Sequence, residues 1–521
     1  MRLHDAFLSC VRLTDQWSDS FIKMVVETLI IAGLVLFALI YAKIFIRPKS
    51  FPPGPIPLPV IGNIHLIGSE PQKSLKALAK KYGDVFSVYF GGWPVVVISS
   101  IESAKESLIQ KSTDFAGRPV SYTGIEAAKG HKTGRGIDIV YSDYGPYWQT
   151  IRKLAHKALK MYGANRVQLE KTINTHADEL MERLAKIDGQ CFDPKRNLCL
   201  AATNVICQIV FGSKYNIDDE EFTTIMYYNK LMFEGIAGAN GVDFLTWMRH
   251  FPNHNISLLR ESGSLRDPIL GKWLKKHRET FEKGNIRDFT DALIDAADEE
   301  IKQNKSSDRY LKEDNMMMIM ADVFNAGIET TTTTMNWFVA FSVLWPETQK
   351  KIHEELDRVI GRTRKPCMDD RPALNYLEAA INETARMASV APLAVPHSTT
   401  CDTSIAGYKI PKGTHVFLNL YAMHHDERHW VDPEDFRPER WLNEEGNYIA
   451  GAHDSFLPFS AGKRVCFGEA LAKMELFLIL AQVYQRFEFL PGNKEDLPKL
   501  DGFVYITHEP KPYKIQVRKR F

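Results

Sequence analysis

Ten residues near the C-terminus, FSAGKRVCFG at positions 459–468, present Cys466 as a candidate metal ligand. The apolar run at 469–487 predicts a helix that begins directly after it. A thiolate at the first turn of a helix gains from free N–H groups and the positive dipole end, which lower its pKa. Gly462 and Gly468 allow close backbone approach to a large flat cofactor. A lone cysteine is more often a buried apolar residue, so the interpretation rests on the whole pattern.

The pattern F-x-x-G-x-R-x-C-x-G resembles the ligand loop of the cytochrome P450 family, the haem-thiolate monooxygenases. The resemblance implies haem b with Cys466 as axial thiolate, a ligand that favours O–O cleavage at the iron. It also implies the P450 fold, mainly α with small β-sheets. Phe459, Gly462 and Gly468 would then contact the cofactor.

Hydrogen-bond donors without acceptor capacity mark a second part of the site. Trp148 and Arg152 are spaced i, i+4, which places both on one face of a predicted helix. Such donors suit a haem propionate. By resemblance, Arg464, Arg118 in DFAGRP and His397 in VPHSTT join them.

The sequence E-x-x-R at Glu383 and Arg386 predicts an ion pair within one helix. Exposed pairs of this kind contribute only ~0.2–0.5 kcal/mol. The segment PEDFRPERW at 433–441 matches the family's P-x-x-F-x-P-E-R pattern and supplies Arg440. By resemblance, the three residues form a buried charge network that braces the loop leading to Cys466.

Residues 314–345 read as one long helix whose centre opposes helix formation. A glycine costs about 1 kcal/mol relative to alanine in a helix, and Gly327 precedes a run of threonines. Sequence that opposes its own helix often marks a functional site. The resemblance implies that Ala326 and Gly327 leave room for dioxygen above the iron. Glu329 and Thr330 would form an acid–alcohol pair that delivers protons.

Composition bounds the remaining possibilities. The chain has 521 residues and a net charge of +1, so its global charge does not suggest a nucleic-acid partner. Its seven cysteines form no C-x-x-C pair, which argues against a disulfide scaffold or a zinc site. We expect one large helical domain at 64–521 with short strands near 85–89 and 95–99.

The N-terminus predicts a membrane anchor. Residues 24–46 are almost wholly apolar, and about 20 such residues cross a bilayer as a helix. Five prolines follow within 52–59, in a connector at 51–63 that favours a stiff, extended chain. We therefore expect an anchor segment at 1–50. By resemblance, it is a single pass in the endoplasmic reticulum membrane, with the catalytic domain facing the cytosol.

Electrons must come from a partner, because the chain carries no flavin or dinucleotide fingerprint. The resemblance implies NADPH used through NADPH-cytochrome P450 reductase, with cytochrome b5 as a second donor. Basic residues that could steer an acidic reductase are Arg152, Lys153, Lys157, Lys160, Arg362, Arg364, Lys365, Lys463 and Lys473.

Several segments resemble two groups of animal microsomal enzymes. FEKGNIRDFTDALID at 281–295 is similar to aryl-hydrocarbon hydroxylases, and FNAGIETTTTTMNW at 324–337 to steroid 17-alpha-hydroxylase/17,20-lyase. The substrate is therefore expected to be a lipophilic steroid or planar aromatic. Apolar side chains expected to contact it are Phe233, Phe324, Ile328 and Val395.

Cys466 alone identifies the cofactor and not the reaction. One alternative is a haem-thiolate isomerase or dehydratase that needs no reductase. Another is a non-catalytic haem protein that binds an apolar ligand. The presence of Glu329 and Thr330 favours oxygen activation, and therefore the monooxygenase.

Overall fold

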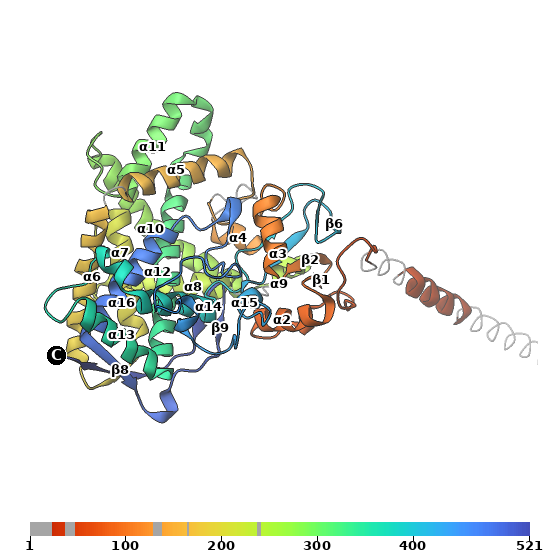
Figure 1. The fold of residues 1–521 in the computed structure, drawn as a ribbon. Coiled ribbons are helices and arrows are strands. Elements are labelled where there is room, and N and C mark those ends of the chain that lie inside the picture. The colour runs from red at the N-terminus through yellow and green to blue at the C-terminus, as the bar shows by residue number, and fades with distance from the viewer. Residues whose placement is uncertain (1–22, 37–46, 129–137, 164–165, 237–240) are drawn as a thin grey trace, which may run out of the picture.

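A computed structural model describes residues 23–36, 47–128, 138–163, 166–236 and 241–521 (Figure 1). Most of the described chain is helical, as predicted, because long stretches repeat apolar residues on one face. The long helices are α2 (Pro71–Tyr82), α5 (Pro146–Gly163), α6 (Arg166–Ile187), α7 (Lys195–Phe211), α8 (Glu220–Ile236), α10 (His254–Thr280), α11 (Phe289–Gln303), α12 (Glu313–Leu344), α13 (Pro346–Val359), α14 (Asn375–Ala388) and α16 (Glu469–Arg486). Shorter ones are α3 (Ile101–Lys105), α4 (Tyr122–Ala127), α9 (Gly241–Phe244) and α15 (Leu420–His424).

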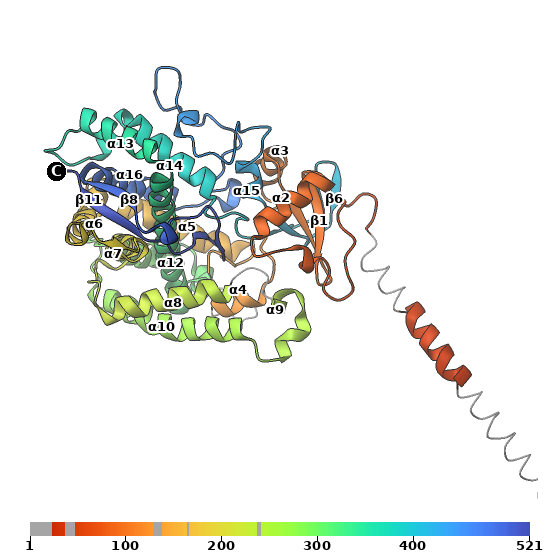
Figure 2. The same cartoon turned by 90° about the horizontal axis from the view of Figure 1, so that it is seen from below.

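Helix α12 is the central element. Its 32 residues make it about 48 Å long. It packs against α7, α14, α16, α10 and α13, and against strand β10 (Figures 1 and 2). Nearly all side chains between Met316 and Val343 are buried. Tertiary packing therefore holds the helix together through the glycine and the threonine run that disfavour it locally.

The main sheet lies at one end of the body, beside α2 and α3 (Figure 2). Its order is β1 (Val85–Phe90), β2 (Trp93–Ile98), β7 (His415–Leu418) and β4 (His397–Ser398). Strands β1 and β2 are antiparallel and meet at Gly91, whose φ of 58° suits the tight turn. These strands confirm the two short runs predicted from the sequence.

The remaining described strands form three small sheets near the C-terminus and the surface. One joins β3 (Cys191–Phe192), β11 (Ile515–Lys519) and β8 (Phe487–Pro491), and two hairpins pair β9 (Gly502–Val504) with β10 (His508–Pro510) and β5 (Thr403–Ile405) with β6 (Tyr408–Ile410). Helices α8 and α10 run side by side across one face of the body (Figure 2).

The proline-rich connector lies along β1. Arg47 donates to the carbonyls of Gly54 and Pro55 at 3.1 and 2.8 Å. The hydroxyl of Ser87 on β1 donates to Pro52 O at 2.8 Å. Asn63 donates to Ile56 O at 3.1 Å and accepts from Tyr89 N at 2.8 Å. The connector is thus attached to the domain along its length.

Residues 23–36 form a helix whose apolar side chains are exposed. Part of the predicted anchor, residues 37–46, lies outside the described residues. Within the described ranges, every helix is too short or too polar to cross a membrane.

Candidate active site

Cys466 lies in a tight loop just before α16. The short 3-10 turn Gly462–Arg464 precedes it, and Cys466 N donates to Phe459 O at 3.0 Å. Gly462 has a φ of 71°, and a Cβ there would lie 1.8 Å from Leu108 O. The close approach that this glycine permits is therefore to the backbone at Leu108. At Gly468 a Cβ would meet Cys466 Sγ at 3.9 Å, an ordinary contact.

The environment of Cys466 acts on its thiol in two directions. Cys466 is exposed, but the protein around it still desolvates the thiol and raises its pKa, whereas the N–H groups of Gly468 and Glu469 and the charge of Arg152 lower it. The helix terminus acts in the predicted sense, but desolvation outweighs it, so the net shift is upward. A thiol so placed becomes a thiolate when a coordinated metal cation supplies the opposing charge.

The predicted propionate donors gather beside this loop. Arg464 stacks 3.9 Å above the Trp148 ring, and Arg152 lies 5.3 Å from the same ring. Trp148 on α5 donates to Ile139 O at 3.0 Å. Arg118 donates to Val140 O at 2.9 Å and to Pro396 O at 2.9 Å. The structure therefore brings these four residues together.

His397 on β4 is buried nearby, with its Nδ1 at 2.7 Å from Phe115 O. Burial, with Arg118 close by, lowers the pKa of His397 to about 3, so its ring is neutral. Because a carbonyl oxygen only accepts, the proton of the neutral ring is on Nδ1, which donates to Phe115 O, and Nε2 is left as an uncharged acceptor.

The three guanidinium groups form an excess of positive charge. Burial and the charges of Arg118 and Arg152 lower the pKa of Arg464 to about 8, and Asp143 and Asp138 offset this only in part. Burial lowers the pKa of Arg118 to about 10. Within the described chain, no ion pair joins these guanidinium groups to a carboxylate. Because unpaired buried charge is costly, the cluster suits a dianionic group such as the two propionates of haem.

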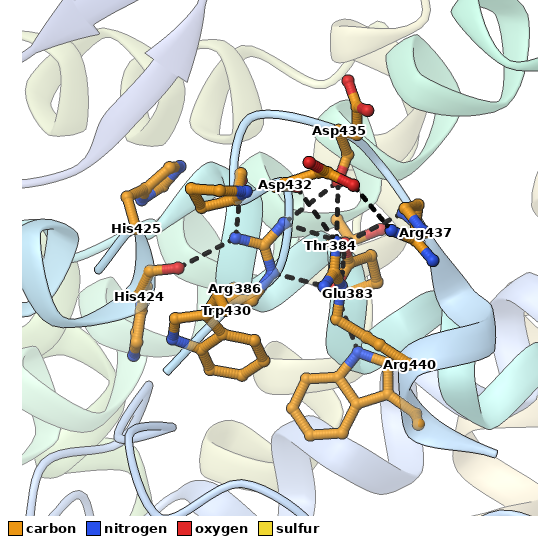
Figure 3. A network of polar contacts seen from close by, with 12 residues as sticks. Glu383, Thr384, Arg386, His424, His425, Trp430, Asp432, Asp435, Arg437 and Arg440 are labelled. Carbon is orange, nitrogen blue, oxygen red and sulfur yellow. Dashed lines mark hydrogen bonds and ion pairs between the residues drawn. The ribbon is translucent and has the colours of Figure 1, made fainter. Parts of the chain in front are cut away.

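A buried network joins α14 to the segment at 424–441 (Figure 3). Glu383 and Arg386 on α14 pair at 2.8 Å with neither side chain exposed. Arg440 Nε donates to Glu383 Oε1 at 3.0 Å, and Trp441 Nε1 donates to Glu383 Oε2 at 3.0 Å. The ion pairs expected among Glu383, Arg386 and Arg440 thus form, and Trp441 Nε1 and the backbone N–H of Arg437 also donate to the carboxylate.

His424 connects this network to the cysteine loop. Arg386 donates to His424 O at 2.8 Å, and His424 Nε2 accepts from Leu457 N at 3.1 Å, two residues before Phe459. Burial lowers the pKa of His424 to about 3, which keeps Nε2 free to accept. The sequence analysis missed this residue because its partner backbone lies outside any motif.

One face of α12 is accessible although the helix is otherwise buried. Ala326 and Thr330, one turn apart, are exposed, and Thr330 Oγ1 donates back to Ala326 O at 2.7 Å. This is the backward hydrogen bond expected for a threonine that relaxes the helix. Gly327 serves a different contact, since a Cβ there would lie 2.9 Å from the Ile206 side chain on α7.

Glu329 does not pair with Thr330 in this structure. Adjacent residues on a helix point about 100° apart, and Glu329 faces Glu509 on β10. Glu509 in turn pairs with Lys195 at 2.5 Å. Burial and the nearby Glu509 raise the pKa of Glu329 to about 8, so it holds a proton at neutral pH.

The predicted substrate residues do not share one cavity. Phe233 and Ile328 line a cavity of about 570 Å³ together with Glu329. Val395 lines another, of about 370 Å³, between the main sheet and α9. Phe324 lines neither cavity, because its ring packs in the core, with its centroid 5.2 Å from that of the Phe211 ring. Parts of the expected substrate segments, residues 129–137 and 237–240, lie outside the described residues.

Most of the basic residues considered for a partner surface are neutralised by acidic neighbours. Ion pairs join Lys153 to Glu300, Lys157 to Glu299, Arg362 to Asp357, Arg364 to Asp370, Lys365 to Asp178 and Lys473 to Glu469. The positive field of this surface is therefore weaker than its residue types alone suggest.

Comparison with known proteins gives consistent matches over nearly the whole chain. The sequence model of the family Cytochrome P450 matches residues 52–517. Steroid 17-alpha-hydroxylase/17,20 lyase of Gallus gallus is 39% identical over 91% of this chain and 92% of its own length. Cytochrome P450 1A1 of Canis lupus familiaris is 36% identical over 90% and 91%.

Solved structures agree. A zebrafish cytochrome P450 with progesterone matches with a TM-score of 0.77 and 36% identity, covering 86% of this chain and 99% of that one. A zebrafish cytochrome P450 with abiraterone has a TM-score of 0.75, also at 36% identity, over 87% of this chain and 100% of that one.

Proposed function

The chain belongs to the cytochrome P450 family and is a haem-thiolate monooxygenase, and we propose that it oxygenates lipophilic substrates while anchored to a membrane. The observation that carries the site assignment is the position of Cys466 beside three guanidinium groups, two buried and one half-buried, that lack a carboxylate partner among the described residues. This arrangement suits a metal-bound thiolate and a dianionic macrocycle together.

We assign roles to the chain's own residues on that basis. Cys466 would ligate the iron, while Arg118, Arg152 and Arg464 would hold the propionates. Trp148 packs against Arg464, and its one N–H would have to leave Ile139 O to reach a propionate. His397 lies beside Arg118 as a neutral ring. Bound haem supplies the iron redox chemistry that activates O2, and the protein supplies position and electrostatics. Phe459 and Gly462 shape the loop around the ligand, whereas the position of Gly468 has room for a Cβ.

Two groups on α12 handle protons in this proposal. Thr330 lies on the accessible face with Ala326, where its hydroxyl can bind a reactant or a water molecule. Glu329 has a pKa of about 8 and therefore exchanges a proton near neutral pH. Because its carboxyl faces Glu509, its proton reaches Thr330 only through water or a side-chain rotation.

We propose a steroid or planar aromatic substrate. Relatives in both groups support this class, since their names denote a steroid hydroxylase and cytochrome P450 1A1. The apolar lining of the cavity at Val395, which includes Phe90, Phe244 and Phe417, is consistent with such a molecule.

A reduced-CO spectrum tests the thiolate ligation, and reductase-coupled turnover tests the reaction. We expect NADPH-dependent hydroxylation of progesterone, of a polycyclic arene, or of both. Absence of product across a broad panel of steroids and arenes, with an intact CO spectrum, would contradict the monooxygenase proposal.

Two other functions give different results in the same assay. An isomerase or dehydratase forms product without NADPH or O2. A non-catalytic haem protein shows ligand-induced spectral shifts but no product. Thr330 on the accessible face of α12 and Glu329, the acid that precedes it in the sequence, favour the monooxygenase over both.

We propose three parts for the chain: an anchor segment at 1–50, a connector at 51–63 and a catalytic domain at 64–521. The exposed apolar side chains of residues 24–36 support a single-pass anchor. The endoplasmic reticulum is the membrane proposed, with the domain in the cytosol. Deletion of residues 1–46 should release the protein from sedimented membranes without loss of the CO spectrum.

Electron supply is proposed to come from NADPH-cytochrome P450 reductase, with cytochrome b5 as a second donor. Because most of its basic residues are paired with acids, this surface is only modestly positive. We therefore expect salt to slow electron transfer from the reductase only modestly. Turnover should fall with rising salt before haem content does. Turnover that stays constant with salt would contradict electrostatic steering.

A further inference from the structure

One turn of the chain, residues 138–142, supports the donors assigned above to the haem propionates. The carbonyl of Ile139 accepts from Trp148 at 3.0 Å and from Arg464 at 3.3 Å. Val140 O accepts from Arg118 at 2.9 Å. Ser142 O accepts from Arg464 at 2.8 Å. The positions of three donor side chains therefore depend on the orientation of this short segment.

The turn itself belongs to no helix or strand. Asp138 bonds locally, accepting from Tyr141 N at 2.7 Å and Ser142 N at 3.1 Å. The turn is tied to α12 by a hydrogen bond from Ile139 N to Asp322 Oδ2, at 2.6 Å. The N–H of Val140 also reaches the Asp322 carboxyl. A single peptide unit thus contacts α12 through its N–H side and the donor cluster through its carbonyl side.

Asp322 lies one turn before Ala326, on the accessible face of α12. Its neighbours in sequence, Ala321 and Val323, are buried. An acidic residue in such a helix is costly unless hydrogen bonds compensate it, and here the compensation comes from the turn. No other function assigned above uses this side chain.

Burial and the nearby Asp138 hold the pKa of Asp322 well above its usual range. The charge of Arg266 on α10 and the bonds from the turn oppose this shift. The group therefore contacts the turn as a hydrogen-bond acceptor whose negative charge is dispensable.

We propose that Asp322 is a positioning residue for haem retention, which fixes from α12 the peptide unit that orients Trp148 and Arg464. The inference rests on the proposed role of Arg464 at the propionates, with Trp148 packed against it. It couples the oxygen side of the site to the cofactor's anchoring side through the hydrogen bonds that Asp322 accepts from Ile139 and Val140.

The test is the rate at which ferric protein loses haem to excess apomyoglobin, for wild type, Asp322→Leu and Asp322→Asn. Leu has a similar size and a high helix propensity but no acceptor, so we expect about tenfold faster haem loss. Asn keeps an acceptor oxygen, so its rate should stay within about twofold of wild type. Equal rates of haem loss for Asp322→Leu and wild type would overturn the inference. Haem loss from Asp322→Asn as fast as from Asp322→Leu would also overturn it.

Matched variants separate this inference from its premise. Asn325 is also a buried polar residue of α12, but it accepts from the Tyr228 hydroxyl at 3.3 Å and not from the turn. Asn325→Leu should therefore leave the rate of haem loss unchanged. Trp148→Phe and Arg464→Ala should both accelerate it. If they do and Asp322→Leu does not, the inference fails and the donor assignment stands. If neither Trp148→Phe nor Arg464→Ala accelerates haem loss, the donor assignment itself is wrong.

A second route covers the case in which Asp322→Leu does not fold. Asp322→Ala also lacks the acceptor and suits the helix, so its haem loss should match that predicted for Leu. In the wild type, the amide hydrogen of Ile139 should exchange slowly with solvent deuterium. In the Asp322→Ala variant, that exchange should be faster. Unchanged exchange in the Ala variant would contradict the hydrogen bond on which the inference depends.

Discussion

Glu383 and Arg386 lie three residues apart on α14 and share two hydrogen bonds, of 2.9 and 2.8 Å, with neither side chain exposed. The same spacing on α13 joins Glu347 to Lys350 at 3.7 Å, but those side chains are 78% and 64% exposed. Two pairs of equal sequence spacing therefore differ in the solvent around them. That difference sets the energetic consequence of losing a partner.

Arg386→Ala should abolish haem incorporation. It leaves the buried Glu383 carboxylate without its bidentate partner, at a cost of about 3–5 kcal/mol. It also removes the donors to His424 O and Pro433 O. The CO difference spectrum per mole of protein measures the loss. Lys350→Ala, the exposed control, should change stability by no more than about 0.5 kcal/mol. Normal haem content in Arg386→Ala would contradict the bracing role.

Gly462→Ala should fail to assemble the cysteine loop. The left-handed conformation alone costs a non-glycine residue about 1–3 kcal/mol, and the new Cβ would lie 1.8 Å from Leu108 O. Gly468→Ala is the matched control, because its Cβ would lie 3.9 Å from Cys466 Sγ. We expect little folded haem protein from the first variant and a nearly normal thiolate CO spectrum from the second.

Glu329 should make stability depend on pH. Its pKa rises from 4.5 to about 8 on folding, so the folded state binds more protons between these values. Its contribution to stability is complete below about pH 4.5 and is lost as the pH rises through about 8. Glu329→Gln should therefore gain melting temperature relative to wild type as the pH is raised across this interval. The control Glu347→Gln removes an exposed carboxylate and should keep the wild-type dependence. A constant difference between Glu329→Gln and wild type would refute the assigned protonation.

Thr330→Val should uncouple NADPH oxidation from product formation. The substitution removes the hydroxyl on the accessible face of α12 and keeps its volume, so haem content should not change. We expect product formed per NADPH to fall by at least about tenfold, as for a lost proton-transfer group. Thr330→Ser restores the hydroxyl and should recover most of the coupling. Full coupling in the valine variant would exclude a role for this hydroxyl.

The parts of this structure that the sequence predicts are those set by local spacing. The central helix was expected at 314–345 and runs from Glu313 to Leu344. Glu383 and Arg386 could be paired because three residues bring side chains to one helix face. Their burial came from the family resemblance, since spacing alone also describes the exposed pair on α13.

The remainder depends on contacts that sequence order does not reveal. Glu329 and Thr330 are neighbours, yet helix geometry separates them and Glu509 from a distant strand takes the carboxyl. Phe324 looked suited to a ligand but packs against Phe211 instead. Lysines at the proposed partner surface acquire acidic neighbours only in three dimensions. Asp322 belongs to no motif, and its importance arises from the turn packed against it.

Among the described residues, the two cavities have one lining residue in common, Tyr505. Both linings are mainly apolar. The cavity at Val395 has Arg118 and Asp243 in its lining, whereas the one at Glu329 has Lys195, Glu509 and Asn229, polar groups that favour water around the acid. A large hydrophobic molecule can therefore fill the first without dehydrating the acid in the second. Tyr505 lines both cavities, so its side chain is placed to separate the space for a hydrophobic molecule from the space around the acid.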